Sequence, residues 1–481
     1  MSTPAEPPPF SPLPPVKSSS PLALFHWFKP APPIPRLSPE QIERLYPRGR
    51  WRVFEAAFIA YATFYLVRNN FAPVSKEIGA ALHYDKAMIG DILAGTSFAY
   101  GFGKFIMGYF ADRSDARKYV GVAMLLTASL NFLFGGANSQ ATHAVLGTFN
   151  GFLPANFQLS TFNFQLFLWT LNGFVQGMGY GPCTRGLSHW FSVKERGTIF
   201  GLWNISHNVG GGIVGVLAAK CAEQWGWSSA FYVPGIIATF CAFYLFWRMR
   251  DTPQSVGLPS IEEYKHEYPP DEKEPHEKEL TARELLFKYI FPNKMLWVLA
   301  FANIFVYIAR YAMVDWGPYY LKEVKGASLA QGGWSTLIIE FAGGLGMLTM
   351  GWLSDKLGGR RARVSVLAMV PLLLAFAAIR ITPKGMLWLD LTLFGVIGFF
   401  VYTPVMFSGV MSLDLTTKKA VGTAAGFVGC FGYVGGRVIQ AKGIGYLAQH
   451  YGWDAALWSM LGCILIGIIL LAFLWNVRPR G

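Results

Sequence analysis

Apolar and polar residues follow one another along this chain in long blocks. Charge-free apolar runs such as 120–136, 230–247 and 457–475 recur, and each is close to the roughly 20 residues that a helix needs to cross a bilayer. The pattern predicts an all-α membrane protein with twelve transmembrane helices. We place these spans at about 53–73, 87–109, 119–136, 162–182, 197–219, 228–248, 295–317, 330–352, 363–380, 386–410, 420–441 and 456–476.

Polar segments divide the chain into four parts. Residues 1–50 are proline-rich and lack the apolar core of a signal peptide, so we expect a disordered cytoplasmic tail. Residues 250–293 are rich in Pro, Glu and Lys and are typical of a linker. The linker separates an N-terminal six-helix bundle over 51–249 from a C-terminal six-helix bundle over 294–481.

Composition supports a membrane protein and excludes other classes. Hydrophobic residues make up 53% of the chain and charged residues only 14%, against about 25% in soluble proteins. The net charge of +13 is spread over alternate loops instead of one patch, so it indicates topology and not nucleic-acid binding. The positive-inside rule places both termini and the linker in the cytoplasm.

Residue patterns for enzymatic chemistry are missing from the sequence. The five cysteines have no metal-ligand spacing, and we find no P-loop, nucleophile elbow or close pair of carboxylates at membrane depth. We therefore expect a protein that is not an enzyme and that needs no metal or cofactor.

The two halves repeat each other. Residues 351–356 match residues 108–113 at an offset of 243, and residues 422–436 match residues 197–211 at an offset of 225. Structural repeats in transporters place the substrate site between the halves near the bilayer midplane, and transport then rocks one half against the other.

Each half carries one arginine inside its first span. Arg68 and Arg310 stand 242 positions apart in matching contexts, Tyr65-Leu-Val-Arg68 and Tyr307-Ile-Ala-Arg310. An arginine in the bilayer costs at least ~2.5 kcal/mol, so it persists where it faces a polar cavity or a partner. Guanidinium groups bind phosphate oxygens bidentately, so the pair predicts a phosphorylated substrate. The alternative is that each side chain reaches out to the membrane surface.

Other polar side chains lie near this depth. His207 stands in the fifth span beside glycines and could hold phosphate or couple protonation to binding, or simply be a hydrogen-bonded core residue. Tyr61, Tyr65 and Tyr307 could donate hydrogen bonds to phosphate or only pack.

Two more charged residues fall within predicted spans. Lys104 and Glu340 could bind substrate directly, or each could join two helices through a salt bridge.

The loops after the second span of each half resemble the signature of the major facilitator superfamily. A carboxylate facing the next helix, beside a cation, would latch the cytoplasmic helix ends together. The expected latch residues are Asp112, Arg113, Asp355 and Lys356. The alternative is that they are ordinary loop charges.

Longer matches resemble the organophosphate:phosphate antiporters of that superfamily, and most closely its glycerol-phosphate branch. The matching stretches are Tyr65-Leu-Val-Arg68, Ala99 to Gly108, Gln176-Gly-Met-Gly, Asn204 to Gly212, Asp251-Thr-Pro-Gln-Ser, Phe305 to Tyr311, and Ala420 to Gly436. The resemblance implies that Arg68 and Arg310 bind phosphate and that His207 lies beside the site. It further implies a pathway lined by Tyr61, Tyr65, Tyr307, Trp203, Lys104, Tyr402 and Tyr433.

Two departures leave the substrate open. Asn69 follows the first arginine where glycerol-phosphate and hexose-phosphate members have lysine, as in phosphoglycerate-type members. Arg437 and Lys442 add cations to the eleventh span, where they could select a second anionic group, such as a carboxylate, or pair with an acidic residue.

The sequence therefore predicts a transporter that exchanges a small organophosphate, first of all glycerol-3-phosphate, for inorganic phosphate by alternating access. The alternatives are a phosphoglycerate or hexose-phosphate antiporter, or a membrane sensor of a phosphorylated sugar. We expect a monomer in the bacterial cytoplasmic membrane, with the lipid bilayer and the phosphorylated solutes as its partners and no nucleic acid.

Overall fold

The computed structural model describes residues 27–111, 114–152, 159–266, 285–416 and 421–477, and within these ranges the fold is all-helical. Before the linker lie nine helices of four residues or more. They are α2 (Pro39–Leu66), α3 (Phe71–Leu82), α4 (Lys86–Ala111), α5 (Ala116–Gly136), α6 (Gln140–Gly151), α7 (Thr161–Gln176), α8 (Tyr180–Trp190), α9 (Val193–Trp225) and α10 (Ser229–Arg248).

Within the described residues, the linker contributes two short elements and the C-terminal half nine more. The linker holds the 3-10 turn η2 (Gln254–Val256) and α11 (Ile261–Tyr264). The C-terminal half holds η3 (Leu285–Ile290), α13 (Lys294–Val324), α14 (Leu329–Lys356), α15 (Arg361–Ile381), α16 (Leu387–Asp414), α17 (Val421–Cys430), the π-helical segment η5 (Phe431–Arg437), α18 (Val438–His450) and α19 (Gly452–Ala472).

Local sequence explains where these helices begin. The side chains of Ser160, Asn293 and Ser328 each accept a hydrogen bond from a backbone N–H in the first turn of α7, α13 and α14. Such caps satisfy donors that the helix itself leaves without partners.

The twelve predicted spans coincide with this helix order. Among the described residues, seven helices are long and apolar enough to cross a membrane by themselves, namely α5, α10, α13, α14, α15, α16 and α19. The other five predicted spans fall on α4 and α9, which are more polar, and on α2 with α3, α7 with α8, and α17 with η5 and α18, where the helix is interrupted. The helix α6 was not expected from the sequence.

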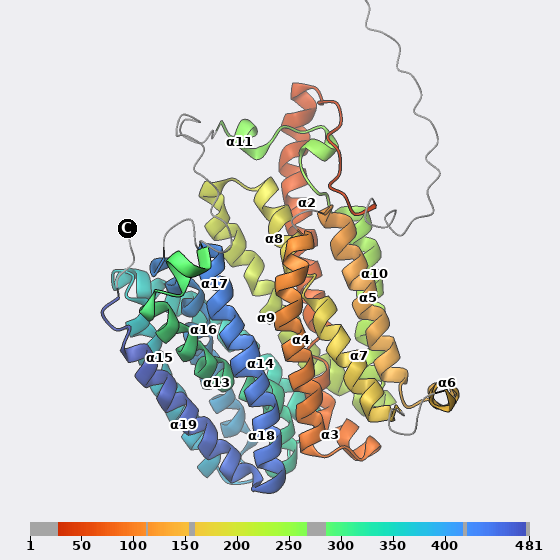
Figure 1. The fold of residues 1–481 in the computed structure, drawn as a ribbon, viewed down its shortest axis with the longest axis vertical. Coiled ribbons are helices and arrows are strands. Elements are labelled where there is room, and N and C mark those ends of the chain that lie inside the picture. Colours follow the sequence, from red (N-terminus) through yellow and green to blue (C-terminus); the bar gives the residue numbers. More distant parts are fainter. Residues whose placement is uncertain (1–26, 112–113, 153–158, 267–284, 417–420, 478–481) are drawn as a thin grey trace, which may run out of the picture.

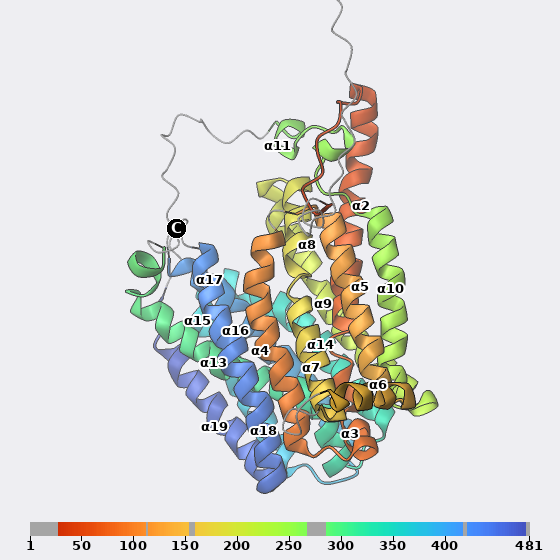
Figure 2. The same cartoon turned by 45° about the vertical axis from the view of Figure 1, so that its right-hand side comes forward.

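The two halves stand side by side (Figure 1). Between them α9 packs against α14, and α4 packs against α18. Figure 2 shows the same arrangement from a second side. We call the end of the molecule that holds α3 and the start of α19 the α3 end, and the opposite end the α11 end.

Glycines bring α9 and α14 unusually close. A Cβ at Gly333 would lie 2.4 Å from the carbonyl oxygen of Gly215, and one at Gly215 would lie 2.6 Å from the carbonyl oxygen of Gly333. No other residue type fits such an approach without moving a backbone. The two halves are therefore in backbone contact here.

Ionic contacts join the halves at the α3 end. The Lys322 ammonium of α13 donates to the carbonyl oxygen of Pro73 at 2.8 Å and pairs with the Glu77 carboxylate, both on α3. Lys76 returns a bond of 2.9 Å to the carbonyl oxygen of Lys322. We call Lys76, Glu77 and Lys322 the α3 clamp.

Two further salt bridges reinforce this end. Lys86 of α4 pairs with Glu323 of α13 at 3.0 Å, and Asp91 of α4 pairs with Lys442 of α18 at 3.0 Å. At the α11 end, by contrast, salt bridges such as Arg361 with Asp414 join elements of one half. The described ionic contacts thus hold the halves together at one end.

The stretch before α2 packs onto the linker and differs from the disorder that we expected for residues 1–50. The backbone N–H groups of Ile34 and Leu37 donate to the carbonyl oxygens of Gln254 and Gly257, and Tyr46 stacks on Tyr264 at 3.9 Å. We call residues 27–38 and 251–265 the collar. Residues 1–26 lie outside the described part of the chain.

Asp251 anchors the collar to the N-terminal half. Its carboxylate accepts from the backbone N–H groups of Ala31 at 3.2 Å and Ala116 at 3.0 Å, and it lies 3.5 Å from the Arg185 guanidinium. Asp115, next to Ala116, is also buried in this contact, and burial raises its pKa above the usual value. The collar therefore belongs structurally to the N-terminal half.

We expect Lys322→Met to loosen the α3 end, because it leaves the Glu77 carboxylate without its partner. The distance between spin labels on Ala81→Cys and Tyr451→Cys, in a background without native cysteines, should become longer or more broadly distributed. Arg380→Met is the matched control, since it breaks a salt bridge with Asp454 inside one half. An unchanged distance distribution in Lys322→Met would show that the clamp does not hold this end.

Candidate functional site

A break between α2 and α3 places Arg68. Helix α2 ends at Leu66, and α3 begins at Phe71 with Pro73 in its first turn. A proline interrupts the preceding turn because it has no N–H and its ring clashes with the carbonyl four residues earlier. Arg68 therefore lies in non-helical backbone in the interior of the protein, where its side chain is only 5% exposed.

Asparagine side chains satisfy the backbone at this break. The carbonyl oxygen of Val67 accepts from Asn131 of α5 at 3.0 Å and from Asn172 of α7 at 3.1 Å. Asn70 donates to Asn131 at 2.8 Å and to the carbonyl oxygen of Ala230 at 2.9 Å. All three asparagines are buried, so this network fixes the backbone that carries Arg68.

Aromatic rings surround the Arg68 guanidinium. Its Cζ lies 3.8 Å from the ring centre of Tyr65 and 4.7 Å from that of Tyr100 on α4. Its Nε is buried and has no hydrogen-bond partner. Cation–π contact offsets part of the cost of burial, but one donor remains available.

Arg310 lies within the unbroken helix α13. Its Nη2 donates to the Tyr402 hydroxyl of α16 at 3.1 Å, and its Cζ lies 4.3 Å from the Tyr402 ring and 4.9 Å from the Tyr311 ring. Its Nε is likewise buried without a partner. The repeated arginines are therefore in similar surroundings on different backbones.

His207 on α9 lies between tyrosines that contact the two arginines. Its ring centre is 5.4 Å from that of Tyr65 and 6.3 Å from that of Tyr402. The Nδ1 of His207 bonds to the carbonyl oxygen of Asn204. That bond orients the ring and leaves Nε2 as the nitrogen that could face a ligand.

A second row of rings joins the halves on the other side. Tyr433 of η5 lies 5.1 Å from Tyr100 and 5.1 Å from Tyr307, measured between ring centres. Tyr307 in turn lies 5.7 Å from Tyr311. The two arginines are thus connected by aromatic contacts through His207 and, separately, through Tyr433.

Three further predicted site residues, Tyr61, Lys104 and Trp203, lie near Tyr180 of α8. Trp203 donates to the carbonyl oxygen of Ala57 at 3.0 Å and packs against Tyr61 at 4.6 Å between ring centres. The Lys104 ammonium lies 4.3 Å from the ring centre of Tyr180, which also contacts Trp203. Lys104 is thus linked to the cluster through aromatic rings.

Glu340 joins the two halves through α9. Its Oε2 accepts from the Asn208 amide at 2.9 Å, and its backbone oxygen accepts from the same amide at 3.1 Å. This contact bridges two helices through a neutral amide and is not the salt bridge that the sequence suggested.

The two extra cations of the eleventh span have separate partners. Arg437, the last residue of η5, pairs with Asp315 of α13 at 3.3 Å, and its Cζ lies 4.0 Å from the Tyr311 ring. Lys442 is exposed and pairs with Asp91 of α4. Asn69 is half-buried beside Arg68.

The predicted latch is only partly within the described residues. Asp112 and Arg113 lie outside them. Asp355 and Lys356 are exposed at the α11 end, where the Lys356 ammonium lies 4.0 Å from the ring of Trp352 in its own helix. The latch role of these residues stays a prediction.

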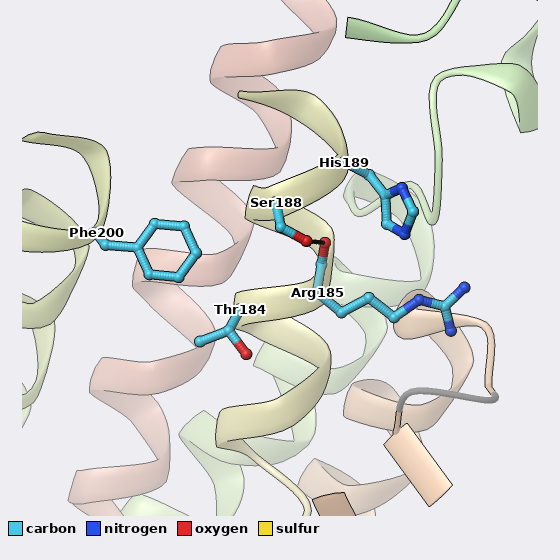
Figure 3. A pocket seen from close by; sticks show the side chains of 5 residues that line it. All are labelled: Thr184, Arg185, Ser188, His189 and Phe200. Atoms are coloured by element: carbon cyan, nitrogen blue, oxygen red, sulfur yellow. Dashed lines mark hydrogen bonds between the residues drawn. The ribbon is translucent and has the colours of Figure 1, made fainter. Parts of the chain in front are cut away.

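A surface cavity of about 410 Å³ lies on α8 and the start of α9, where its lining residue Phe200 contacts Trp203. Figure 3 shows Thr184 and Phe200 on one side, with Arg185 and His189 pointing away from Phe200. Arg185 donates to the carbonyl oxygen of Ala111 at 3.3 Å and to that of Ser114, so it ties the end of α4 to α8. This cavity is a feature of the N-terminal half and does not include the paired arginines.

Several residues of the cluster were not predicted. Tyr100, Tyr180, Tyr311 and Asp315 line it together with the expected side chains. Tyr100 precedes Lys104 by one helical turn and Tyr311 follows Arg310, so proximity to an intramembrane charge could have indicated both. Within the described residues, no group of three or more His, Cys, Asp or Glu could hold a metal ion.

The arrangement suits a small dianion. Three buried guanidiniums, those of Arg68, Arg310 and Arg437, share this region with two buried carboxylates, those of Asp315 and Glu340. Positive charge is therefore in excess, and two buried guanidinium Nε donors have no protein partner in the arginine pair. Phosphate oxygens accept such donors strongly.

Comparison with known proteins gives close relatives over nearly the whole chain. The glycerol-3-phosphate transporter of Bacillus subtilis is 40% identical over 95% of this chain and 99% of the relative. A probable hexose phosphate transport protein of Chlamydia trachomatis is 36% identical over 92% of this chain and 94% of the relative. The membrane sensor protein UhpC of Escherichia coli is 33% identical over 92% of this chain and 95% of the relative.

Solved structures and a family model agree on the fold. The structure of the nucleoside transporter NupG superposes with a TM-score of 0.67 over 89% of this chain and 100% of that chain, at 13% identity. The model of the Major Facilitator Superfamily matches residues 57–439. The chain therefore belongs to the major facilitator superfamily.

Proposed function

We propose that this protein is an organophosphate transporter that exchanges a small phosphorylated metabolite, first of all glycerol-3-phosphate, for inorganic phosphate by alternating access. The observation that carries the proposal is the pair of buried arginines, Arg68 and Arg310, at repeated positions in the two halves. Each has a buried Nε without a protein partner. A phosphate group between the halves would supply the missing acceptor.

His207 would complete the phosphate site. It lies between Tyr65 and Tyr402, the two tyrosines that contact the arginines. Because Nδ1 is taken by the carbonyl oxygen of Asn204, the ring can donate from Nε2 to a phosphate oxygen only when it is protonated, so bound phosphate and a proton on His207 would favour each other. The same residue would thus bind the substrate and make binding sensitive to pH.

Contacts between the halves support alternating access. The α3 clamp and the Lys86 and Lys442 salt bridges close the α3 end, while salt bridges at the α11 end lie within one half. Under the proposed topology, with both termini in the cytoplasm, this conformation faces inward. The outward-facing state would then require these bridges to break.

The proposed setting is a bacterial cytoplasmic membrane, in which the protein acts as a monomer. The membrane itself follows from the family and the apolar helices. The relatives named above are bacterial proteins, which supports the choice of membrane.

A sensor is the second candidate, because one relative named as a membrane sensor is 33% identical. Proteoliposomes loaded with phosphate separate the two functions. They should take up labelled glycerol-3-phosphate, and a panel with 3-phosphoglycerate, phosphoenolpyruvate and glucose-6-phosphate identifies the preferred substrate. Binding of a phosphorylated sugar without uptake of any solute would favour the sensor.

Arg68→Lys and Arg310→Lys should each reduce phosphate exchange by roughly tenfold to a hundredfold or more. Lysine keeps the charge but loses the planar fork, and a hydrogen bond to a charged group contributes about 1.5–3 kcal/mol. Exchange in proteoliposomes measures the effect, with Arg380→Lys as the matched surface control. Near-normal exchange by either buried variant would refute the phosphate-pair assignment.

His207→Ala should weaken phosphate binding and flatten its pH dependence between about pH 5.5 and 8, because it removes the group that must gain a proton in order to donate to bound phosphate. Binding titrations at several pH values measure both effects. His143→Ala is the control, since His143 is exposed on α6. If the pH profile of His207→Ala matches that of the unaltered protein, His207 is a packing residue.

Asp355→Asn should slow exchange more than it weakens equilibrium binding, because a latch acts on the balance between conformations and not on the substrate. Exchange rates and binding affinities are compared in one preparation. Glu263→Gln, an exposed carboxylate of the collar, serves as control. Equal losses in rate and affinity would contradict a latch.

A further inference from the structure

Asp315 and Arg437 form a buried ion pair next to the arginine pair. The side chains of both residues are about 95% buried, and they meet through one contact of 3.3 Å between Nη2 and Oδ1. The Tyr311 ring lies 4.0 Å from the Arg437 Cζ and 4.9 Å from the Arg310 Cζ. One ring therefore separates this ion pair from a proposed phosphate-binding guanidinium.

The pair is electrically neutral but incompletely hydrogen-bonded. The Nε of Arg437 is buried without a partner, and so is the Oδ2 of Asp315. Buried polar atoms are nearly always satisfied, so orphans beside a binding site indicate a missing ligand group. One orphan is a donor and the other is an acceptor.

A hydroxyl group matches this combination. It can accept a hydrogen bond, as Arg437 Nε requires, and donate one, as Asp315 Oδ2 requires. A carboxylate can only accept, so it would gain one bond and face the negative Asp315 oxygen. The neutral pair thus complements an alcohol better than a second anion.

The backbone places Arg437 for this role. It ends the π-helical segment η5, four residues after Tyr433, which faces Tyr100 and Tyr307. Single π-helical turns within α-helices occur often at functional sites because they displace side chains from the regular spacing. Here η5 brings both residues to the same cluster.

We propose that Asp315 and Arg437 form a subsite that recognises a hydroxyl group on the organic part of the substrate and selects polyol phosphates over carboxylated organophosphates. The inference rests on the proposed transport function and narrows its substrate class. It also changes our interpretation of Arg437, which the sequence left open between a carboxylate receptor and a structural pair.

A competition panel tests the subsite. Uptake of labelled phosphate into phosphate-loaded proteoliposomes is inhibited by glycerol-3-phosphate, by n-propyl phosphate, which lacks the hydroxyl groups, and by 3-phosphoglycerate, which adds a carboxylate. We expect glycerol-3-phosphate to inhibit the unaltered protein ~10-fold better than either analogue, as for one lost hydrogen bond to a charged group. Equal inhibition by glycerol-3-phosphate and n-propyl phosphate would overturn the subsite.

Two variants test the two residues separately. Asp315→Asn keeps the size of the side chain but leaves the Arg437 charge unneutralised, so inhibition by 3-phosphoglycerate relative to glycerol-3-phosphate should rise ~10-fold. Arg437→Lys keeps the ion pair but loses Nε, so the advantage of glycerol-3-phosphate over n-propyl phosphate should shrink toward unity. Unchanged ratios in both variants would overturn the proposal.

Controls separate this inference from the proposed function. Asp91→Asn breaks the exposed salt bridge with Lys442 and should leave all inhibition ratios as in the unaltered protein. If the unaltered protein exchanges phosphate but the panel shows no preference, only the subsite fails. If the unaltered protein does not exchange phosphate at all, the proposed function fails and the subsite with it. Thermal unfolding checks that Asp315→Asn and Arg437→Lys remain folded.

Discussion

The burial of guanidinium groups at membrane depth is the constraint on which the rest of this structure depends. Arg68, Arg310 and Arg437 are each 4–6% exposed, and a charge in such a place requires compensation. The protein provides it mainly with tyrosine rings, one hydroxyl acceptor and one carboxylate. This compensation is incomplete by a few hydrogen bonds, and that shortfall is what a phosphorylated ligand can satisfy. The unsatisfied donors therefore lower the stability of the protein without ligand and, for the same reason, favour the binding of a phosphorylated ligand.

The two halves hold their buried arginines on different backbone structures. Arg310 lies in an unbroken helix, whereas Arg68 lies in a break that requires three buried asparagines to satisfy it. Repeated sequences in the two halves therefore need not have the same local structure. The N-terminal arginine depends on a polar network inside its own bundle, and the C-terminal one depends on packing against Tyr402. Substitutions around the two arginines should be read with this asymmetry in view.

Much of the fold followed from the sequence because hydrophobic blocks of membrane length leave few alternatives. The helix order and the family were predicted correctly. The interruption of the helix at Arg68 was not predicted, although Pro73 indicates it. An apolar block by itself does not distinguish a straight span from a broken one. The partner of Arg437 could not be chosen, since Asp315 is 122 positions away and only the packing of α13 against η5 brings them together. Residues 27–38 were part of the tail that we expected to be disordered. Their proline-rich composition gives no sign of the hydrogen bonds that they form with the linker, which lies more than 200 positions further along the chain.

The contact between Gly215 and Gly333 has a mechanical consequence. It is a place where the backbones of the two halves touch without intervening side chains, so it can act as the fulcrum of a rocking motion. At this point only small neighbours, such as Ala219 and Thr336, lie beside the two glycines, so few side chains would have to rearrange during the proposed rocking motion. A methyl group at either position would clash with the carbonyl oxygen of the other glycine, so one of the two backbones would have to move. The proposed rocking motion would therefore depend on glycine at both positions as much as on the charged residues between the halves.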